Sequence, residues 1–118
     1  MPTIHIGVLN IVLFIPGARS LKDGRAALAS LRDKVRHRFD VSVNELPSDT
    51  PARRELVVTT SGADAKTIRS TLDRIRSFIE DSDQARAAEV HVEVFPWQRP
   101  HVIGGSWPID IGGDDDDG

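Results

Sequence analysis

Residues 3–15 read TIHIGVLNIVLFI, a run in which apolar side chains occupy both odd and even positions. Leu9 and Ile11 are examples at odd positions, and Val8 and Val12 are examples at even positions. A strand that is apolar on both parities is usually covered on both faces and lies in the middle of a sheet. We therefore expect residues 3–15 to form a long central strand around which the other elements assemble.

A helix is expected next, from Ser20 to about Arg38. Pro16-Gly17 predicts the turn that ends the strand, and Ser20 is a typical N-cap residue. Apolar residues then recur with the 3.6-residue period of a helix that packs one face on a core. These residues are Leu21, Gly24, Leu28, Leu31 and Val35, with Phe39 closing the pattern.

The rest of the folded part alternates in the same way between strand and helix patterns. Strands are expected at residues 41–46, 55–60 and 88–95, and residues 46–53 have the composition of a loop. A second helix follows Gly62, with Ser61 or Asp64 as its cap. Its predicted buried stripe is Ile68, Leu72, Ile75 and Ile79.

This order, βαββαβ, predicts an α+β domain of the ferredoxin-like, split βαβ type. Each helix crosses over between parallel strands, and the second and third strands form a hairpin. The expected result is a four-stranded antiparallel sheet in the order 4-1-3-2, with two helices on one face. We expect residues 1–96 to form this single domain and residues 97–118 to form a flexible acidic tail rich in Gly, Pro and Asp.

Composition excludes several classes of protein. The 118 residues contain no cysteine, which rules out disulfides, thiolate catalysis and cysteine-ligated metals. The net charge is -3, but five of the eighteen acidic residues follow residue 100, so residues 1–100 carry 15 basic against 13 acidic residues. No basic residue precedes the apolar run at 6–15, so it does not have the pattern of a secretory signal, and it is too short to span a bilayer. We expect a cytoplasmic protein without a membrane partner.

Three segments resemble one family of small bacterial proteins. They are Ile6-Gly7-Val8-Leu9, then Pro16-Gly17-Ala18-Arg19-Ser20-Leu21-Lys22 with Arg25, and Arg38-Phe39-Asp40-Val41-Ser42-Val43-Asn44-Glu45. In this order, over about residues 4–95, they resemble the YlxP-like (DUF503) family. The resemblance implies a ferredoxin-like fold and a bacterial cytoplasmic protein of undetermined function. Genes of this family often lie among genes for translation initiation and ribosome maturation, which implies an RNA or ribosome partner by association only.

The chain departs from this family at two places. The family usually has Lys or another long polar residue where this chain has Gly24, so that one basic position is lost. The segment after Phe95 is also longer than the family core and is not covered by the resemblance.

The first helix carries most of the positive charge. Residues 19–38 hold seven of the fifteen basic residues and only two acidic ones, a local charge of +5. At 100° per residue, four of the basic residues lie within about 80° of one another on one edge of the helix. The backbone N–H groups that follow Ser20 are donors for a phosphate. The candidate anion- or RNA-binding residues are Arg19, Ser20, Lys22, Arg25, Arg32 and Arg36.

No catalytic, cofactor or metal site is predicted. The four histidines lack the spacings HxH and HExxH, and no glycine-rich phosphate loop joins a strand to a helix. Ser20 has no base in sequence and is expected to cap its helix. Glu45 is expected to pair with a basic residue of the first helix. These observations favour a non-enzymatic protein. The basic first helix, taken with what the family resemblance implies, makes rRNA or a ribosomal subunit the expected partner, with a homodimer as a further possibility.

Three other interpretations remain open at this point. The basic edge of the first helix is also what an ordinary solvated surface looks like. The first strand has apolar residues for both faces, which predicts a homodimer through the open sheet face, or cover from residues 97–107. The third interpretation is a regulatory domain that binds a small anion beside the start of the first helix. A base-stacking sheet is not expected, because the third strand has no aromatic residue.

Overall fold

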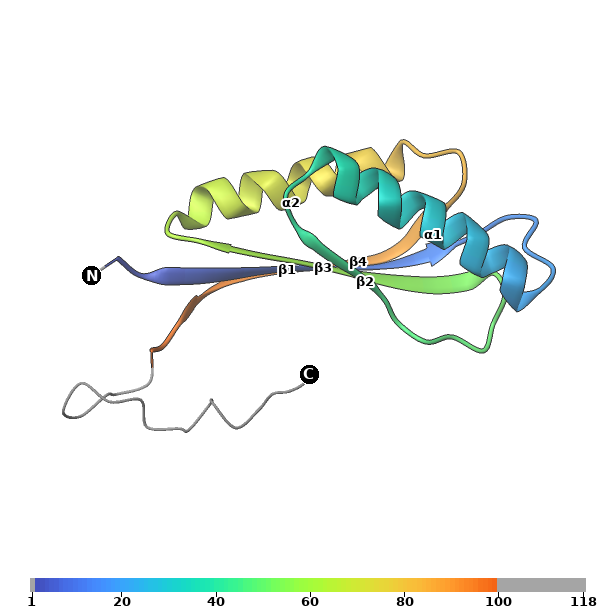
Figure 1. The fold of residues 1–118 in the computed structure, drawn as a ribbon, viewed down its shortest axis with the longest axis horizontal. Coiled ribbons are helices and arrows are strands. Elements are labelled where there is room, and N and C mark those ends of the chain that lie inside the picture. Colours follow the sequence, from blue (N-terminus) through green and yellow to red (C-terminus); the bar gives the residue numbers. More distant parts are fainter. Residues whose placement is uncertain (1, 100–118) are drawn as a thin grey trace.

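The computed structural model describes residues 2–99 as four strands and two helices in the order βαββαβ (Figure 1). This is the element order that the sequence predicts. The elements are β1 (Ile4–Phe14), α1 (Leu21–Arg38), β2 (Ser42–Glu45), β3 (Arg53–Gly62), α2 (Ala65–Glu80) and β4 (Arg86–Trp97).

The strands form one antiparallel sheet in the order β2-β3-β1-β4, with β1 and β3 in the middle. Read from the other end, this is the predicted order 4-1-3-2. Leu9 of β1 lies opposite Val58 of β3 and Val92 of β4, which fixes the register at the centre. Both helices lie on the same face of the sheet (Figure 1). The predicted ferredoxin-like, split βαβ fold is therefore confirmed.

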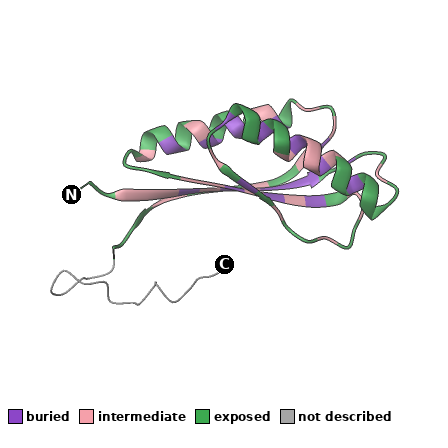
Figure 2. Ribbon diagram, viewed as in Figure 1, coloured by how far each residue is buried: buried purple, intermediate pink, exposed green. Residues whose placement is uncertain are grey.

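The core lies between the helices and the odd-numbered side of β1. Leu9, Ile11 and Leu13 are fully buried there, and the inward faces of both helices are buried against them (Figure 2). Each such side chain contributes about 1.5–3 kcal/mol relative to an exposed one. Gly7 lies close beneath α2, since a Cβ built there would lie 2.3 Å from Ile68 Cγ2.

The opposite face of the sheet has a mixed character. Among residues 2–99, no helix covers it. Ile6 and Val8 are half-buried there, whereas Phe14 and Trp97 are 47% and 43% exposed. The midpoint is polar, because the Asn10 amide donates to the carboxylate of Glu55 at 2.8 Å. This outer face therefore presents apolar side chains toward both ends and hydrogen-bonded polar groups between them.

Some predicted boundaries were wrong by a few residues. β3 begins at Arg53, inside the predicted loop, and α2 is capped by Asp64, the second of the two predicted caps. β4 runs through Pro96 to Trp97, one residue into the predicted tail. Proline is tolerated there because β4 is an edge strand. On the side of β4 that has no neighbouring strand, a missing N–H breaks no hydrogen bond of the sheet. Residues 100–118, most of that tail, lie outside the described residues.

Candidate functional site

The N-terminus of α1 is capped from within the chain. Ser20 is the N-cap, as predicted, and its Oγ accepts a hydrogen bond from the Asp23 N–H at 3.1 Å. The Asp23 carboxylate in turn accepts from the Arg19 N–H at 3.3 Å. A carboxylate in the first turn is what the helix dipole favours. The position predicted for a phosphate is therefore shared with an acidic side chain of the protein itself.

The middle and end of the predicted basic edge point at β2. Arg32 Nη1 forms an ion pair with Glu45 Oε2 at 2.5 Å, and its Nε lies 3.0 Å from the Asp33 carboxylate. Arg36 Nη2 donates to the backbone carbonyl of Val43 at 2.6 Å. The predicted pairing of Glu45 with a basic helix residue is confirmed. Arg32 and Arg36 thus join the helix to the edge strand of the sheet.

The remaining members of the predicted site are more exposed. Arg19 and Lys22 lie on the surface at the start of α1, and Arg25 lies one turn further along. Neither Lys22 nor Arg25 is in an ion pair with any residue in the range 2–99. Of the predicted site residues, two lie around Glu45. Arg32 forms an ion pair with Glu45, and Arg25 lines the same pocket as Glu45.

That pocket contains a residue that sequence reasoning does not single out. A cavity of about 320 Å³ lies beside the first half of α1 and is lined by Arg25, Glu45, Leu46, Pro47, Ser48 and Arg54. Arg54 is only 4% exposed, and its Nε and Nη1 have no hydrogen-bond partner within residues 2–99. The reason for its burial is parity: Arg54 shares the helix-facing side of β3 with Leu56 and Val58. We call this cavity the Arg54 pocket.

Gly24 explains how the helix packs over this pocket. A Cβ built on Gly24 would lie 2.3 Å from the carbonyl oxygen of Pro51 and 3.4 Å from Arg54 Cδ. The β2–β3 loop therefore rests directly on the helix backbone, and the aliphatic part of Arg54 lies beside the same residue. Gly24 is a packing position under the loop, and a long polar side chain in this conformation would collide with Pro51.

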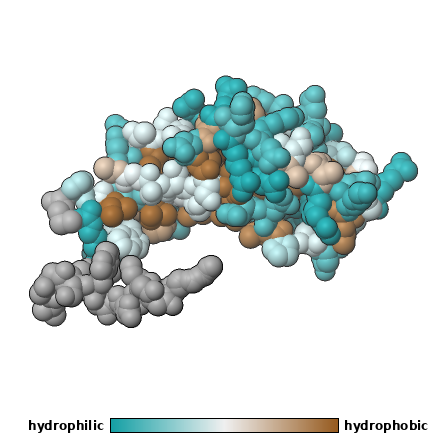
Figure 3. Space-filling model, viewed as in Figure 1, coloured by the Kyte–Doolittle hydropathy of each residue, from teal (hydrophilic) through white to brown (hydrophobic). Residues whose placement is uncertain are grey.

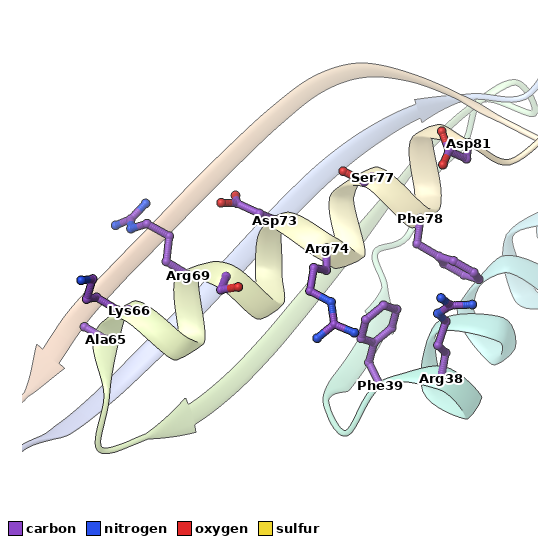
Figure 4. A pocket seen from close by; sticks show the side chains of 11 residues that line it. Arg38, Phe39, Ala65, Lys66, Arg69, Asp73, Arg74, Ser77, Phe78 and Asp81 are labelled. Carbon is purple, nitrogen blue, oxygen red and sulfur yellow. The ribbon is translucent and has the colours of Figure 1, made fainter.

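A second basic cluster lies where α1 ends beside α2. A groove of about 690 Å³ runs along α2, and its basic lining residues are Arg38, Lys66, Arg69 and Arg74 (Figure 4). Asp73 and Asp81 also line it and reduce its net charge to +2. Sequence reasoning does not place these four residues together, because only the packing of the two helices creates the groove.

The aromatic residues of the groove are held by arginines. The rings of Phe39 and Phe78 meet edge to face with centroids 5.8 Å apart. The Arg38 guanidinium lies 5.2 Å from the Phe78 ring, and that of Arg74 lies 5.6 Å from the Phe39 ring (Figure 4). These stacked arginines have a defined position from which their remaining N–H groups can reach an anion.

Charge is distributed unequally between the two sides of the molecule. α1 carries six basic and two acidic residues, and α2 carries four and two, so the helices together carry +6. The strand positions of the outer sheet face carry two basic residues, Arg53 and Arg86, against three glutamates. Hydrophilic atoms cover most of the helix layer in the view of Figure 3. The two helices therefore carry an excess of positive charge that the strand positions of the outer sheet face do not.

Two carboxyl groups have lowered pKa values, and neither belongs to the candidate anion-binding residues. The Thr67 hydroxyl and the Lys66 N–H stabilise the charged form of Asp64 and lower its pKa, as expected for a helix cap. His91 and then Arg53 lower the pKa of Glu89 on the outer sheet face. Within residues 2–99, no group of three His, Asp or Glu side chains is arranged to hold a metal ion.

The topology and the charge together define a small ferredoxin-like domain with a basic helical side. The chain belongs to the family described as "Protein of unknown function (DUF503)", which it matches over residues 6–92. This confirms the resemblance found in the sequence. No curated protein is similar enough in sequence to count as a relative. No helix in the described range 2–99 is long and apolar enough to cross a membrane.

Two designed proteins are among the solved structures similar to this chain. The de novo designed protein Foldit4 has 18% sequence identity and a TM-score of 0.44, and the match covers 81% of this chain and 99% of the design. The de novo designed protein LFR1 1 with ferredoxin fold has 14% identity and a TM-score of 0.41, with 93% and 95% covered.

Proposed function

We propose that this protein is a non-enzymatic cytoplasmic RNA-binding protein that associates with rRNA or a ribosomal subunit through its helical side. The contact surface, the basic helix layer, consists of the exposed residues Lys22, Arg25, Arg38, Lys66, Arg69 and Arg74. The observation that carries the proposal is the unequal charge of the two faces, +6 on the helices against an excess of one acidic residue on the outer sheet face. A one-sided positive field attracts and orients a polyanion.

The arrangement of these residues favours an extended ligand. Lys66 and Arg69 lie at the start of α2, Arg38 and Arg74 lie where the two helices meet, and α1 begins at the far end of the same layer (Figures 1 and 4). The positive charges therefore follow the length of the helix layer and do not gather around one point. A series of phosphates along a nucleic acid backbone matches this spacing better than a single small anion does.

Recognition on this surface would depend on phosphates and shape. The aromatic rings of the groove are already stacked against Arg38 and Arg74, and Phe39 is only 8% exposed. The centre of the outer sheet face holds the hydrogen-bonded Asn10 and Glu55 where a base-stacking sheet would present aromatic rings. The supported mode is therefore that of a protein that reads folded RNA by its backbone.

The test is binding of a folded rRNA fragment, measured by fluorescence anisotropy at several salt concentrations. Two double variants, Lys22→Glu/Arg25→Glu and Lys66→Glu/Arg69→Glu, reverse two charges each at opposite ends of the layer. Each is expected to weaken binding and to reduce the slope of log K against log salt by about 1 for each phosphate that the variant no longer binds. Arg32 is kept, because its pairing with Glu45 makes it part of the fold.

A matched control reverses two charges on the outer sheet face. The double variant Arg53→Glu/Arg86→Glu changes the net charge by the same amount, and within residues 2–99 the one ion pair it removes is the exposed pair between Arg53 and Glu89. It is expected to retain most of the affinity. Equal losses in all three variants would mean that only total charge matters, and the proposed surface would then be wrong.

A homodimer through the outer sheet face is the second candidate. It is favoured by the apolar side chains on that face, among them Ile6, Val8 and the 43% exposed Trp97. Sedimentation equilibrium of the full chain tests it, with Val8→Lys as the variant. A dimer that Val8→Lys converts to a monomer would support this candidate, and a wild-type monomer at all concentrations would exclude it.

A further inference from the structure

We propose that the Arg54 pocket binds a phosphate group, with the Arg54 guanidinium as its main ligand and Arg25 as a second cation. This site is separate from the basic helix layer in its chemistry, since a buried arginine forms it. The proposal does not rest on the proposed RNA-binding function, although Arg25 lies on the border of both surfaces.

Arg54 is a buried charge without a partner among the described residues. Arg54 is 4% exposed, no carboxylate within residues 2–99 forms an ion pair with it, and two of its nitrogens donate to nothing in that range. A buried cation without partners is costly, and buried polar groups in folded proteins are almost always hydrogen-bonded. An anion in the adjoining pocket, which Arg54 lines, would supply the counter-charge that this buried guanidinium lacks.

The wall of the pocket is positively charged and suits an anion. Arg25 adds a second positive charge at the rim, where it is exposed. Glu45 is the acidic group of the lining, and Arg32 pairs with it, so the local balance stays positive. A guanidinium offers a rigid fork of donors that matches the oxygens of a phosphate in a bidentate manner.

Hydrogen bonds and backbone packing hold the pocket in shape. The Ser48 hydroxyl donates at 2.7 Å to the carbonyl of Arg53 and accepts from the Thr50 N–H at 3.1 Å, which orders the loop that forms one wall. Gly24 lets the same loop rest on α1 through the Pro51 carbonyl. The site is therefore preorganised, and little ordering cost is added when an anion enters.

The phosphate has two chemical sources that the pocket itself does not distinguish. A small phosphorylated molecule could place its phosphate there, and so could the backbone of an RNA lying across Arg25. Inorganic phosphate tests the shared chemistry, AMP represents the small molecule, and a short single-stranded RNA represents the backbone. Stabilisation by AMP or by phosphate without RNA binding would identify a small-molecule site.

The experiment measures the thermal unfolding of the full chain in sodium phosphate and in sodium chloride of equal ionic strength. A ligand that binds only the folded state raises Tm with concentration. The wild type is expected to be stabilised by phosphate. Arg54→Met should raise the apparent Kd about 10- to 100-fold, because it removes hydrogen bonds to a charged group. Arg53→Met is the matched control, with the same charge change on the opposite face of β3.

Arg25→Gln provides a second variant that leaves the buried residue in place. Arg25 is exposed and unpaired within residues 2–99, so its replacement should not disturb folding. We expect it to weaken phosphate stabilisation less than Arg54→Met does, yet more than Arg53→Met. The proposal would be overturned if phosphate stabilised wild type, Arg25→Gln and Arg53→Met equally, or if it stabilised none of them. If Arg54→Met fails to fold, the comparison of Arg25→Gln with Arg53→Met still decides.

Discussion

Replacing Gly24 by Ala tests how α1 packs on the β2–β3 loop, because two physical effects of opposite sign compete at this residue. Alanine has the higher helix propensity, which alone would stabilise a helix by about 1 kcal/mol. Its Cβ, however, would lie 2.3 Å from the carbonyl oxygen of Pro51, a backbone atom that moves only if the loop moves. Adding a methyl group to such a packed site typically costs about 1–3 kcal/mol.

The packing effect should win at Gly24. We expect a net loss of up to about 2 kcal/mol in the free energy of unfolding, measured by urea denaturation followed by far-UV circular dichroism. Each kcal/mol corresponds to a fall in Tm of about 4–8 °C for a domain of this size. Ala26→Gly, at an exposed position of the same helix, calibrates the propensity effect and should also cost about 1 kcal/mol. A Gly24→Ala variant more stable than the wild type would show that the loop does not rest on the helix.

Four further substitutions follow from the contacts in the fold. Ser20→Ala removes the N-cap bond of α1 and should cost about 1 kcal/mol in urea denaturation; no change would mean that this bond adds nothing to the stability of the helix. Ile75→Ala leaves a cavity in the core and should cost about 2–5 kcal/mol. Glu45→Gln leaves Arg32 without its half-buried partner and should cost about 1–3 kcal/mol, a loss that high salt reduces only in part. Asp64→Asn should be less stable than the wild type at neutral pH. The lowered pKa of Asp64 contributes stability above the unfolded value near 3.8, which is lost as the pH falls through the folded pKa, so the two proteins should converge in acid.

The fold can be predicted from the sequence because its signals are local and strong. The two-sided apolar pattern of residues 3–15 places β1 in the middle of the sheet, and the helical stripes ending at Val35 and Ile79 place both helices on the core. The end of β4 is harder to predict because Pro96 normally stops a strand. Its position on an edge strand, opposite His5, removes that restriction.

The candidate site is predictable only in part, for reasons of tertiary geometry. A helical wheel places Arg32 and Arg36 on one edge of α1, but it does not show that β2 lies beneath that edge and engages both. Arg54 escapes prediction because residues 46–53 have the composition of a loop and the expected strand starts at Glu55. The alternation of Leu56 and Val58, extended back by two residues, places Arg54 on the buried side.

Gly24 shows why a missing basic residue is not always a lost binding site. In the sequence, Gly24 gives the first helix one basic residue fewer than the related family usually has there. In the structure, its backbone supports Pro51 and lies beside the stem of Arg54, so it helps to form the Arg54 pocket. Two cationic groups therefore lie at this end of the molecule. The guanidinium of Arg54 comes from β3, beneath the helix, and that of Arg25 comes from the helix surface.

The basic helix layer is tested by co-sedimentation of the full chain with purified ribosomal subunits at roughly 50 and 200 mM salt. The quadruple variant Lys22→Glu/Arg25→Glu/Lys66→Glu/Arg69→Glu is compared with the wild type and with Arg53→Glu/Arg86→Glu. We expect the wild type and the sheet-face variant to sediment with a subunit at low salt and to be released at higher salt, and the quadruple variant to stay in solution at both. Association of the quadruple variant at wild-type level, or wild-type association independent of salt, would contradict the account.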